Sequence, residues 1–570
     1  MKESSWLIAK PMPQSYKDSF PEIHPVILQL LYNRGLSTQE AIDEFTNPDY
    51  GQDIHDPFLF RDMEKTVERI FKALKEKEPI VVHGDYDADG VCGAAIMVST
   101  LKIIEPDCQV EVYLPDRQIE GYGLNIQTVK ELAKNGTKLI ITVDCGTSNI
   151  EEVALANQLG LEVIITDHHM PHPELPRAFS VINPWCVGDN YPFQKLSGAG
   201  VAFKLAQALF KKRQMKESME KWLLDLVALG TIGDYVSLVG ENRTLVKYGM
   251  IVLQKTRRVG LQSLYAVMSL KSEAIDSRAV AFQIVPRLNA AGRVDHANSA
   301  YELIITGLKE EADRLALNLH KMNQERQRLT EKITQEAKTQ LGEVTPEQYL
   351  LVAQGRDWPA GLVGLVASRL TDEYHRPTVI IGKRQNQIIG SGRSLPEFHI
   401  TEALKKLEHL LSHYGGHRQA CGFTLKEGAT VSEFKKGLQE LAASQLKQVD
   451  LKPKLAIEAE LTFGQIDWTL TEALETFAPF GEGNPIPRFV TRSAEVIDWE
   501  QVGADQKHLR LVVRDKSQVA RRLIGFGFGE WGDRLTRQDK VDVAYEIGFN
   551  EWNGTRELQL KMIDIKPSHG

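Results

Sequence analysis

Carboxylate and imidazole side chains gather in three short stretches of this sequence, and their types indicate metal chemistry. The stretches are HGDYDAD at 83–89, Asp144 in VDCG, and DHH at 167–169. Oxygen and imidazole ligands without thiolates suit manganese or magnesium, and the histidines favour manganese. Two such ions about 4 Å apart, bridged by a carboxylate, activate water and stabilise both oxygens that exchange in phosphoester hydrolysis. The residue types therefore predict a phosphoryl hydrolase.

A calcium-binding loop is the alternative interpretation of DYDADG at 85–90. An EF-hand loop begins in this way, but it needs a glutamate at its twelfth position and a helix on either side. Counted from Asp85, the twelfth position is Ile96. The preceding PIVV at 79–82 predicts a buried parallel strand, and residues 91–104 predict a helix. A strand, an acidic turn and a helix are typical of an α/β fold and disfavour the calcium loop.

Three predicted strands place these side chains together. The runs IVVHGD, LIITVD and EVIITD each end in ligand groups. In open α/β sheets, binding sites form outside the carboxyl ends of the strands. One aspartate at such a place usually caps a helix, whereas three strand ends that all carry ligand groups indicate a site. Asp234, which ends an apolar helix in GTIGDYVSL, is a candidate to join them.

Five regions follow from the pattern of the chain. Residues 1–75 predict a helical N-terminal region, with a Ser/Thr helix-start signal in LLYNRGLSTQEAIDEF. Strands and helices alternate over 76–305, as in a parallel sheet. Residues 306–345 contain a long charged helix over 308–341 that joins two domains, and 346–450 predict a second α/β domain. The short alternating strands of 451–570 predict a small β-barrel such as an OB-fold.

Composition bounds the class of protein. The 570 residues are 42% hydrophobic and 25% charged, with a net charge of −8, so nonspecific coating of nucleic acid is disfavoured. No apolar stretch approaches the roughly 18 residues of a membrane span, and the start lacks the features of a signal peptide, which predicts a cytoplasmic protein. The five cysteines are scattered and odd in number, and therefore predict reduced thiols.

The motifs resemble those of the DHH phosphoesterase superfamily. HGDYDADG, VDCG, TDHH and GTIGDYV match its successive motifs, and PRLNAAGRVDHA, GLVGLVASRL, SGRS, YGGHRQACG and FGEGNPIP are similar to those of its RecJ family. That family consists of single-strand-specific 5′-to-3′ DNA exonucleases of recombination and repair. The resemblance implies a DHH catalytic domain, a DHHA1-like domain that binds DNA phosphates, and an OB-fold domain that binds single strands.

The resemblance also implies roles for the ligand groups. It assigns His83, Asp87 and Asp144 to one metal ion. It assigns Asp89, Asp144, His168 and Asp234 to a second, with Asp144 as the bridge. Asp85 and Asp167 would orient the ligands, and His169 would contact the scissile phosphate. The implied cofactors are two divalent ions, with Mn²⁺ preferred and Mg²⁺ as the alternative.

Further residues are expected to hold the DNA strand. SGRS and GGH offer glycines for close backbone approach and donors for phosphate, although Gly415-Gly416 alone would suit an ordinary turn. The implied phosphate contacts are Arg287, Asn289, Ser391, Arg393, Gly415, Gly416 and His417. Arg117 and Tyr122 would stack on bases, with an exposed loop as the alternative. A basic face of the barrel would combine Lys507, Arg510, Arg514, Arg521 and Arg522.

Two positions depart from the family pattern, and two other functions compete. Pro359 replaces a histidine that commonly follows the tryptophan, and Cys421 replaces a small apolar residue, which suggests packing. The competing functions are a DHH hydrolase of short oligoribonucleotides or cyclic dinucleotides, and a non-catalytic replication scaffold. The expected partners are single-stranded DNA, a single-strand-binding protein and a RecQ-type helicase. The expected state is a monomer that does not contact membranes.

Overall fold

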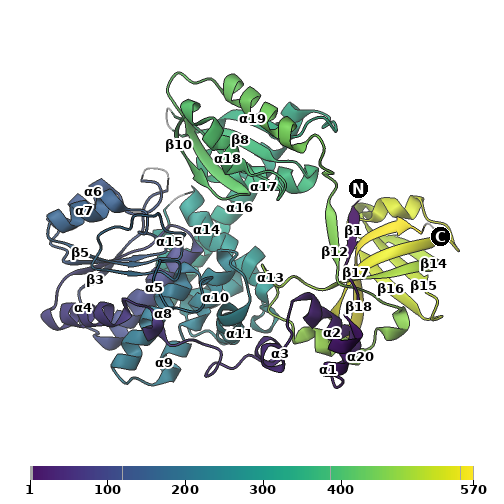
Figure 1. Cartoon of the computed structure of the whole chain (residues 1–570), viewed down its shortest axis with the longest axis horizontal. Coiled ribbons are helices and arrows are strands. Elements are labelled where there is room, and N and C mark those ends of the chain that lie inside the picture. The colour runs from purple at the N-terminus through teal and green to yellow at the C-terminus, as the bar shows by residue number, and fades with distance from the viewer. Residues whose placement is uncertain (1–3, 118–119, 295, 385–386, 553, 569–570) are drawn as a thin grey trace. The chain divides into compact units, whose positions relative to one another are not determined.

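The computed structural model describes residues 4–117, 120–294, 296–384, 387–552 and 554–568, and the chain divides into two compact units (Figure 1). The larger unit comprises His55–Val236 and Tyr248–Lys452. The smaller unit combines Met1–Ile54, Ser237–Lys247 and Pro453–Gly570. The first and last parts of the sequence therefore fold together, an association that the local sequence pattern did not predict.

A five-stranded parallel sheet forms the first half of the larger unit, as predicted. Its strand order is β3-β2-β4-β5-β6, and every pairing is parallel. The short strand β6 was not predicted, because three residues are too few to show a pattern. The strands are β2 (Ile80–His83), β3 (Val110–Tyr113), β4 (Leu139–Val143), β5 (Glu162–Thr166) and β6 (Ser180–Ile182).

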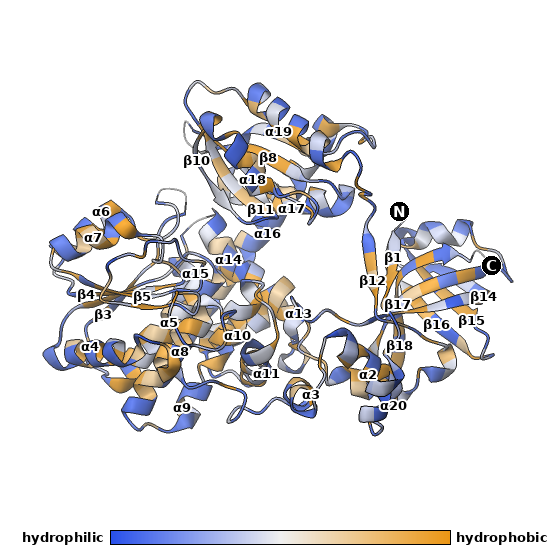
Figure 2. Cartoon of the chain, in the orientation of Figure 1, coloured by the Kyte–Doolittle hydropathy of each residue, from blue (hydrophilic) through white to orange (hydrophobic). Residues whose placement is uncertain are grey.

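Helices cover both faces of this sheet (Figure 1). On one face, Val129 of α6 and Val153 of α7 pack against Ile140 and Val163 of the strands. On the other face, α5 and α8 are buried almost throughout and are largely orange in Figure 2, as expected for helices that are apolar on all sides. The helices up to α10 are α4 (Met63–Glu76), α5 (Ala88–Ile104), α6 (Ile126–Lys134), α7 (Ile150–Gln158), α8 (Gly198–Lys212), α9 (Glu217–Lys221) and α10 (Leu224–Gly233), with η1 (Pro57–Leu59).

A helical region follows the sheet and ends in the long helix that the sequence predicted. Helix α16 spans Lys309–Leu341 and begins one residue later than predicted. Its apolar stripe is buried, including Leu315, Leu319 and Ile333. The elements before it are α11 (Gly240–Gln254), α12 (Val259–Met268), η2 (Ser272–Ala274), α13 (Ser277–Ala279), the π-helix η3 (Val280–Ile284), α14 (Val285–Val294) and α15 (Asn298–Ile305).

A second α/β fold completes the larger unit. Its strand order is β10-β11-β9-β8-β7, in which only β7 and β8 pair in parallel. Pro359 ends β7 and precedes α17, so it fits the change from strand to helix, and Cys421 is a packing residue in the core. The elements are β7 (Leu351–Pro359), α17 (Ala360–Tyr374), β8 (Thr378–Arg384), β9 (Gln387–Arg393), α18 (Ile400–Lys406), η4 (Glu408–Leu410), β10 (Leu411–Gly416), β11 (Ala420–Leu425) and α19 (Val431–Leu446).

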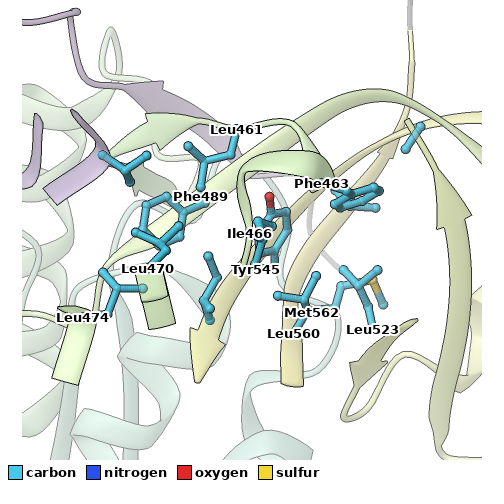
Figure 3. Close-up of a cluster of buried hydrophobic side chains, with 14 of the residues drawn as sticks. Leu461, Phe463, Ile466, Leu470, Leu474, Phe489, Leu523, Tyr545, Leu560 and Met562 are labelled. Atoms are coloured by element: carbon cyan, nitrogen blue, oxygen red, sulfur yellow. The ribbon is translucent and has the colours of Figure 1, made fainter. Parts of the chain in front are cut away.

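The smaller unit contains the predicted barrel. Strands β14, β15, β16, β18 and β17 pair in that order, and β14 also pairs with β17, which closes the ring. Phe489, Tyr545 and Leu560 point into its core (Figure 3). The elements are β12 (Lys454–Ile457), β13 (Ala459–Glu460), η5 (Phe463–Gln465), α20 (Trp468–Glu475), β14 (Arg488–Val502), η6 (Ala504–Gln506), β15 (His508–Arg514), β16 (Ala520–Gly525), η7 (Gly529–Asp533), β17 (Lys540–Trp552) and β18 (Thr555–Pro567).

The N-terminal residues add to this unit. Strand β1 (Ser5–Ile8), which was not predicted, pairs in parallel with β12. Val26 and Leu30 of α2 pack into the barrel core, as does Phe45 of α3. Thr38 caps α3 by accepting the N–H of Ala41, as the helix-start signal predicted. The helices are α1 (Gln14–Ser19), α2 (Pro25–Asn33) and α3 (Gln39–Thr46). Among the described residues, no helix has the length and apolar character needed to cross a membrane.

Candidate metal centre

The DYDADG turn joins the end of β2 to the start of α5. Asp87 is the N-cap of this helix and accepts the N–H groups of Asp89 and Gly90, at 2.9 and 3.2 Å. The N–H of Ala88, which lies between Asp87 and Asp89 in the chain, donates to Oδ1 of Asn289 at 2.7 Å. The three carboxylates of the turn, at alternate positions, thereby all lie at the same edge of the sheet. Asp85 and Asp89 are buried, with 4% and 1% of their surface exposed.

Asp144 lies in the turn at the end of β4 and has a backbone conformation that few residues adopt. Its φ is +61°, in the left-handed region, where aspartate is tolerated better than most side chains. Helix α8 approaches it so closely that a Cβ atom on Gly198 would lie 2.5 Å from the Cβ of Asp144. Such strain persists at functional sites when the surrounding structure holds it.

The DHH run follows β5, and its aspartate orients its second histidine. Asp167 accepts hydrogen bonds from the backbone N–H of Thr147 at 3.0 Å and of His168 at 2.8 Å. The Nδ1 atom of His169 lies 2.8 Å from Oδ1 of Asp167. Burial alone would raise the pKa of Asp167, but the hydrogen bond and the charge of His169 outweigh it and lower this pKa to about 2. Asp167 is therefore positioned to orient His169, and its predicted role in orienting the metal ligands stays a prediction.

His168 lies among carboxylates from three other elements. Its Nε2 atom is 3.0 Å from Oδ1 of Asp144, 3.5 Å from Oδ2 of Asp234 and 3.9 Å from Oδ2 of Asp89. Asp234 is the C-cap of α10, as the end of the apolar helix predicted. Burial and the neighbouring positive charge of His169 lower the pKa of His168 to about 4, which leaves a neutral imidazole suited to metal binding.

The electrostatics of this cluster favour the binding of a cation. Burial and the charge of Asp87 raise the pKa of Asp89 to about 7. Burial and the charges of Asp89 and Asp87 raise the pKa of Asp234 to about 9. The pKa of Asp144 is also raised, for the same reasons. Buried carboxylates that repel one another are stabilised in their charged form by a bound metal ion.

Orphaned atoms test whether the residues fit such an ion. Among the described atoms of the candidate ligand residues, four are buried without a hydrogen-bond partner: His83 Nε2, Asp85 Oδ1, Asp144 Oδ1 and His168 Nε2. The last two atoms lie 3.0 Å apart without forming a hydrogen bond, so both can direct lone pairs at one cation. Burying such atoms unpaired is costly, and coordination would satisfy them. The donor set therefore fits divalent metal ions.

The grouping of the ligands differs in part from the one implied by the resemblance. Three sets have ligand atoms within 4.8 Å of one another, namely Asp89, His168 and Asp234, then Asp85, Asp87 and Asp144, and then Asp144, His168 and His169. The first set matches the second predicted ion apart from Asp144. In the second set Asp85 lies where the prediction placed His83, so Asp85 is close enough to bind metal directly. His83 belongs to none of these sets, and its orphaned Nε2 remains its link to the site.

Tyr122 lies at this centre, and Arg117 lies beside the acidic turn. The hydroxyl of Tyr122 donates to the carbonyl of Asp144 at 2.8 Å and lies 3.0 Å from Nδ1 of His169. The guanidinium of Arg117 lies 4.9 Å from the centroid of the Tyr86 ring. Tyr122 thus touches the proposed metal ligands, whereas base stacking by either side chain stays a prediction.

The two residues predicted in PRLNAAGR have structural partners. Arg287 lies 3.2 Å from Nδ1 of His320 and donates to the carbonyl of Gln283 at 2.6 Å. The Oδ1 atom of Asn289 already accepts the N–H of Ala88. The oxygen of Asn289 therefore supports the acidic turn, and its amide nitrogen is the donor left for a phosphate, so the predicted phosphate contact stays a prediction.

The SGRS segment lies on β9 and the GGH segment at the end of β10, with β11 paired between these two strands. Arg393 of β9 donates to Oγ of Ser391 at 3.1 Å, and that hydroxyl donates to the carbonyl of Cys421 on β11 at 3.0 Å. His417 follows β10 and is exposed, and its backbone N–H donates to the carbonyl of Ala420 at 2.7 Å. The register places Gly415 and Ser391 opposite the same residue of β11, Gly422, so the two segments lie at the same level of the second sheet.

The two glycines of GGH differ. A Cβ atom on Gly416, whose φ is +138°, would lie 2.2 Å from the carbonyl oxygen of Ala420. A Cβ atom on Gly415 would meet nothing within 4 Å. The hairpin between β10 and β11 therefore requires glycine at 416, and the described structure gives no packing reason for glycine at 415.

Three of the five side chains of the predicted basic face of the barrel are paired with acids. Arg510 pairs with Glu500 at 2.7 Å, Arg514 with Glu495 at 3.1 Å, and Lys507 with Asp505 at 3.1 Å. Arg521 donates to the carbonyl groups of Phe463 and Ile466. Cross-strand neighbours supply the acids for the first two pairs, and sequence position alone did not show this. The free positive charge of this face is smaller than predicted.

Other residues that the sequence analysis missed support the ligands. The N–H groups of Gly198 and Ala199, in the first turn of α8, donate to the two oxygens of Asp89 at 2.6 and 2.9 Å. The signal was SGAG at 197–200, since Ser197 caps this helix. Arg293, in the last turn of α14, donates to the carbonyl of Gly361 at 3.1 Å and so links the two α/β folds.

Comparisons with known proteins agree with this geometry. The DHH family N-terminal domain matches residues 79–231, the DHHA1 domain 347–444 and the RecJ OB domain 457–564. The chain is 36% identical to the single-stranded-DNA-specific exonuclease RecJ of Bacillus subtilis, over 99% of this chain and 71% of the relative. It is 30% identical to that of Haemophilus influenzae, over 95% and 96%.

A solved structure agrees as well. The crystal structure of RecJ in complex with Mn²⁺ from Thermus thermophilus matches with a TM-score of 0.83 and 29% identity, over 99% of this chain and 80% of that chain. A second structure of that protein, in complex with Mg²⁺, matches with a TM-score of 0.78. The matched domains, the near full-length relatives and the shared fold lead to one conclusion: this chain belongs to the RecJ family.

Proposed function

We propose that this chain is a metal-dependent, single-strand-specific DNA exonuclease that degrades DNA from 5′ to 3′ in recombination and repair. The observation that carries the proposal is the convergence of carboxylates and imidazoles with orphaned ligand atoms at one edge of the first sheet. Its relatives are named single-stranded-DNA-specific exonucleases. We further propose a cytoplasmic monomer that works with a single-strand-binding protein and a RecQ-type helicase.

The residues of the chain divide the work of hydrolysis. Asp89, His168 and Asp234 would hold one divalent ion, and His83, Asp85 and Asp87 would hold another, with Asp144 shared between them. The ions, with manganese preferred, supply water activation and neutralise charge on the phosphate. Asp167 fixes the orientation of His169, which would contact the scissile phosphate. Ser391, Arg393, His417 and the exposed backbone at Gly415 would hold further phosphates.

The competing functions fit less well. A non-catalytic scaffold would have no need of four buried, orphaned ligand atoms. A hydrolase of cyclic dinucleotides or short oligoribonucleotides would not require the closed barrel of the smaller unit. Both remain distinguishable from an exonuclease by the products formed.

The polarity and strand preference provide the test. Single strands labelled at the 5′ or the 3′ end should be digested with Mn²⁺ present, and the 5′ label should appear first as a mononucleotide. Blunt duplex of the same length should be a poor substrate, by about tenfold or more, because a buried centre admits a flexible single strand more easily than a stiff duplex. Product sizing on denaturing gels measures both. Comparable digestion of duplex and single strand in the same salt would contradict the proposal.

The two glycines of GGH provide a matched pair of variants. Gly416→Ala should destabilise the hairpin, because the new Cβ would collide with the carbonyl of Ala420. Gly415→Ala should leave the melting temperature unchanged and weaken binding of a single-stranded oligonucleotide by roughly threefold to tenfold, if phosphate approaches the backbone there. Thermal unfolding and fluorescence anisotropy measure the two effects. Unchanged DNA binding by a folded Gly415→Ala variant would remove Gly415 from the phosphate site.

A further inference from the structure

Cys145 lies in the turn after β4 and directs its thiol at the imidazole that ends β2. The side chain is fully buried, at 0% exposure. Its Sγ atom lies 3.7 Å from Nδ1 of His83 and 3.8 Å from the carbonyl oxygen of the same residue. The turn is held in place because the hydroxyl of Thr142 donates to the carbonyl of Cys145 at 2.8 Å.

The number of hydrogens decides how these two contacts are made. A thiol carries one hydrogen and can accept through sulfur. If the thiol donated to Nδ1, it would have no hydrogen left for the carbonyl oxygen of His83. Both contacts are satisfied together only when Nδ1 of His83 carries a proton and donates it to sulfur, while the thiol donates to the carbonyl. In that arrangement Nε2 of His83 carries a lone pair.

We propose that Cys145 is a positioning residue that holds His83 in the tautomer with its Nε2 lone pair directed at the metal centre. This inference rests on the proposed function, in which His83 belongs to that centre. The Nε2 atom is buried and has no hydrogen-bond partner among the residues that the structure describes, as expected for an atom that binds a metal ion. The partner of the second ring nitrogen commonly fixes the tautomer of a metal-binding histidine.

Two groups near the ring nitrogen can select the tautomer, the thiol of Cys145 and the backbone carbonyl of His83 itself, whereas a further contact does not select it. The ring of Tyr113 stacks on that of His83, with centroids 5.3 Å apart and planes inclined by 21°. Stacking fixes the plane of the imidazole but does not distinguish its two nitrogens. A direct role of the thiol as a metal ligand is disfavoured, because Cys145 belongs to none of the ligand groups found among the described residues.

The experiment measures metal binding by the full-length chain, apart from activity. Free Mn²⁺ is followed by its electron paramagnetic resonance signal during titration of wild type, Cys145→Ala, Cys145→Ser and His83→Ala. Cys186→Ala is the matched control, since Cys186 is a buried thiol of the same sheet domain that packs in an apolar cluster. We expect Cys145→Ala to weaken the more affected site by about 10- to 100-fold. Cys145→Ser should bind more tightly than Cys145→Ala, because a hydroxyl keeps the donor and the acceptor at this position, although on a shorter bond, and Cys186→Ala should bind like wild type.

The tautomer itself gives a second readout. In metal-free protein with ¹⁵N-labelled histidine, the His83 signals, assigned by their loss in His83→Ala, should show a protonated Nδ1 in wild type and in Cys145→Ser. In Cys145→Ala the two tautomers should mix. If the alanine variant does not fold, the protonation of Nδ1 can still be compared between wild type and the serine variant.

The outcomes separate the two proposals. If His83→Ala binds Mn²⁺ like wild type, His83 is not a ligand and the proposed metal centre is wrong at that position. If His83→Ala weakens binding while Cys145→Ala does not, the metal centre stands and the role of Cys145 is overturned. Equal weakening by the serine and alanine variants would also overturn it, because packing rather than hydrogen bonding would then explain the effect.

Discussion

Replacing Asp144 with asparagine is expected to abolish hydrolysis without unfolding the protein. Asp144 belongs to two of the three ligand groups found among the described residues, and its Oδ1 lies 3.0 Å from Nε2 of His168, which belongs to the third. Loss of a bridging ligand should lower the rate constant by more than about a hundredfold, which corresponds to about 2.7 kcal/mol of barrier. Asparagine is chosen because it tolerates the positive φ of this position better than alanine does.

The same substitution, Asp144→Asn, should not lower the stability of the metal-free protein. The charges of Asp89, Asp87 and Asp234, together with burial, raise the pKa of Asp144, which shows that its charged form is disfavoured. Removing that charge relieves repulsion, so the melting temperature without metal should stay the same or rise. Single-turnover digestion of a labelled strand with saturating Mn²⁺ measures activity, and calorimetry measures unfolding.

A control variant and a threshold of activity decide the test of Asp144. Asp313→Asn, which changes an exposed carboxylate on α16, should leave both quantities unchanged. An Asp144→Asn variant that is folded and retains more than about a hundredth of wild-type activity would contradict the shared-ligand assignment. A large fall in its melting temperature would instead make Asp144 a structural residue.

The second large effect concerns Arg243 and the stability of the smaller unit. Arg243 is 1% exposed, and its guanidinium donates to the carbonyl groups of Phe45 at 2.7 Å and of Phe477 and Ala478 at 2.9 Å. It also lies 4.0 Å from the centroid of the Phe45 ring. Burial lowers its pKa to about 10, and the guanidinium stays charged at neutral pH. One side chain thus ties three distant segments of the sequence together.

Arg243→Ala should lower the free energy of unfolding of this unit by about 3–5 kcal/mol, because several buried carbonyl groups lose their donor. Arg492→Ala is the matched control. Arg492 forms ion pairs with Glu460 and Asp542 but is 46% exposed, so its loss should cost less than about 1 kcal/mol. Urea denaturation measures the free energy of unfolding of each variant. Hydrogen exchange shows which part of the chain is destabilised. Equal stability of the two variants would show that Arg243 is not the anchor of this unit.

Arg243 also changes how the function of the barrel can be tested. The sequence suggests a cut near Lys452-Pro453, where composition changes. A fragment ending there would leave Val26, Leu30 and Phe45 without the core into which they pack, and Arg243 without its carbonyl partners. Point variants on the barrel surface therefore test its role in DNA binding more cleanly than truncation does.

Much of the catalytic fold could be predicted from the sequence because its signals are local. Each strand of the first sheet is a short apolar run followed at once by its ligand group, as in IVVHGD and EVIITD. Strand, turn and helix are consecutive in the chain, so residue type and spacing suffice to place the ligands at one edge of a parallel sheet. The long charged helix was predictable for the same reason, since a 3.6-residue period repeats over many turns.

Strand β14 shows where the local pattern is interrupted. Its pairing with β17 shifts register between Thr491 and Ala494, and Ser493 has a φ of +50°. Such a bulge breaks the alternation of buried and exposed residues by which a strand is recognised in sequence. The sequence pattern therefore predicts β14 less clearly than an uninterrupted strand. The pairing of β14 with β17 nevertheless closes the barrel.

The sequence by itself determined the family, the chemistry of the ligands and the parallel sheet that presents them. Only the tertiary structure decided that Asn289 supports the acidic turn, that Arg510 and Arg514 are neutralised by cross-strand acids, and that Gly416 rather than Gly415 is required by the hairpin. It also joined residues 1–54 to the barrel. The physical reason is the same in each case: the partner atom lies far away in the sequence, and residue type and spacing carry no record of a distant partner.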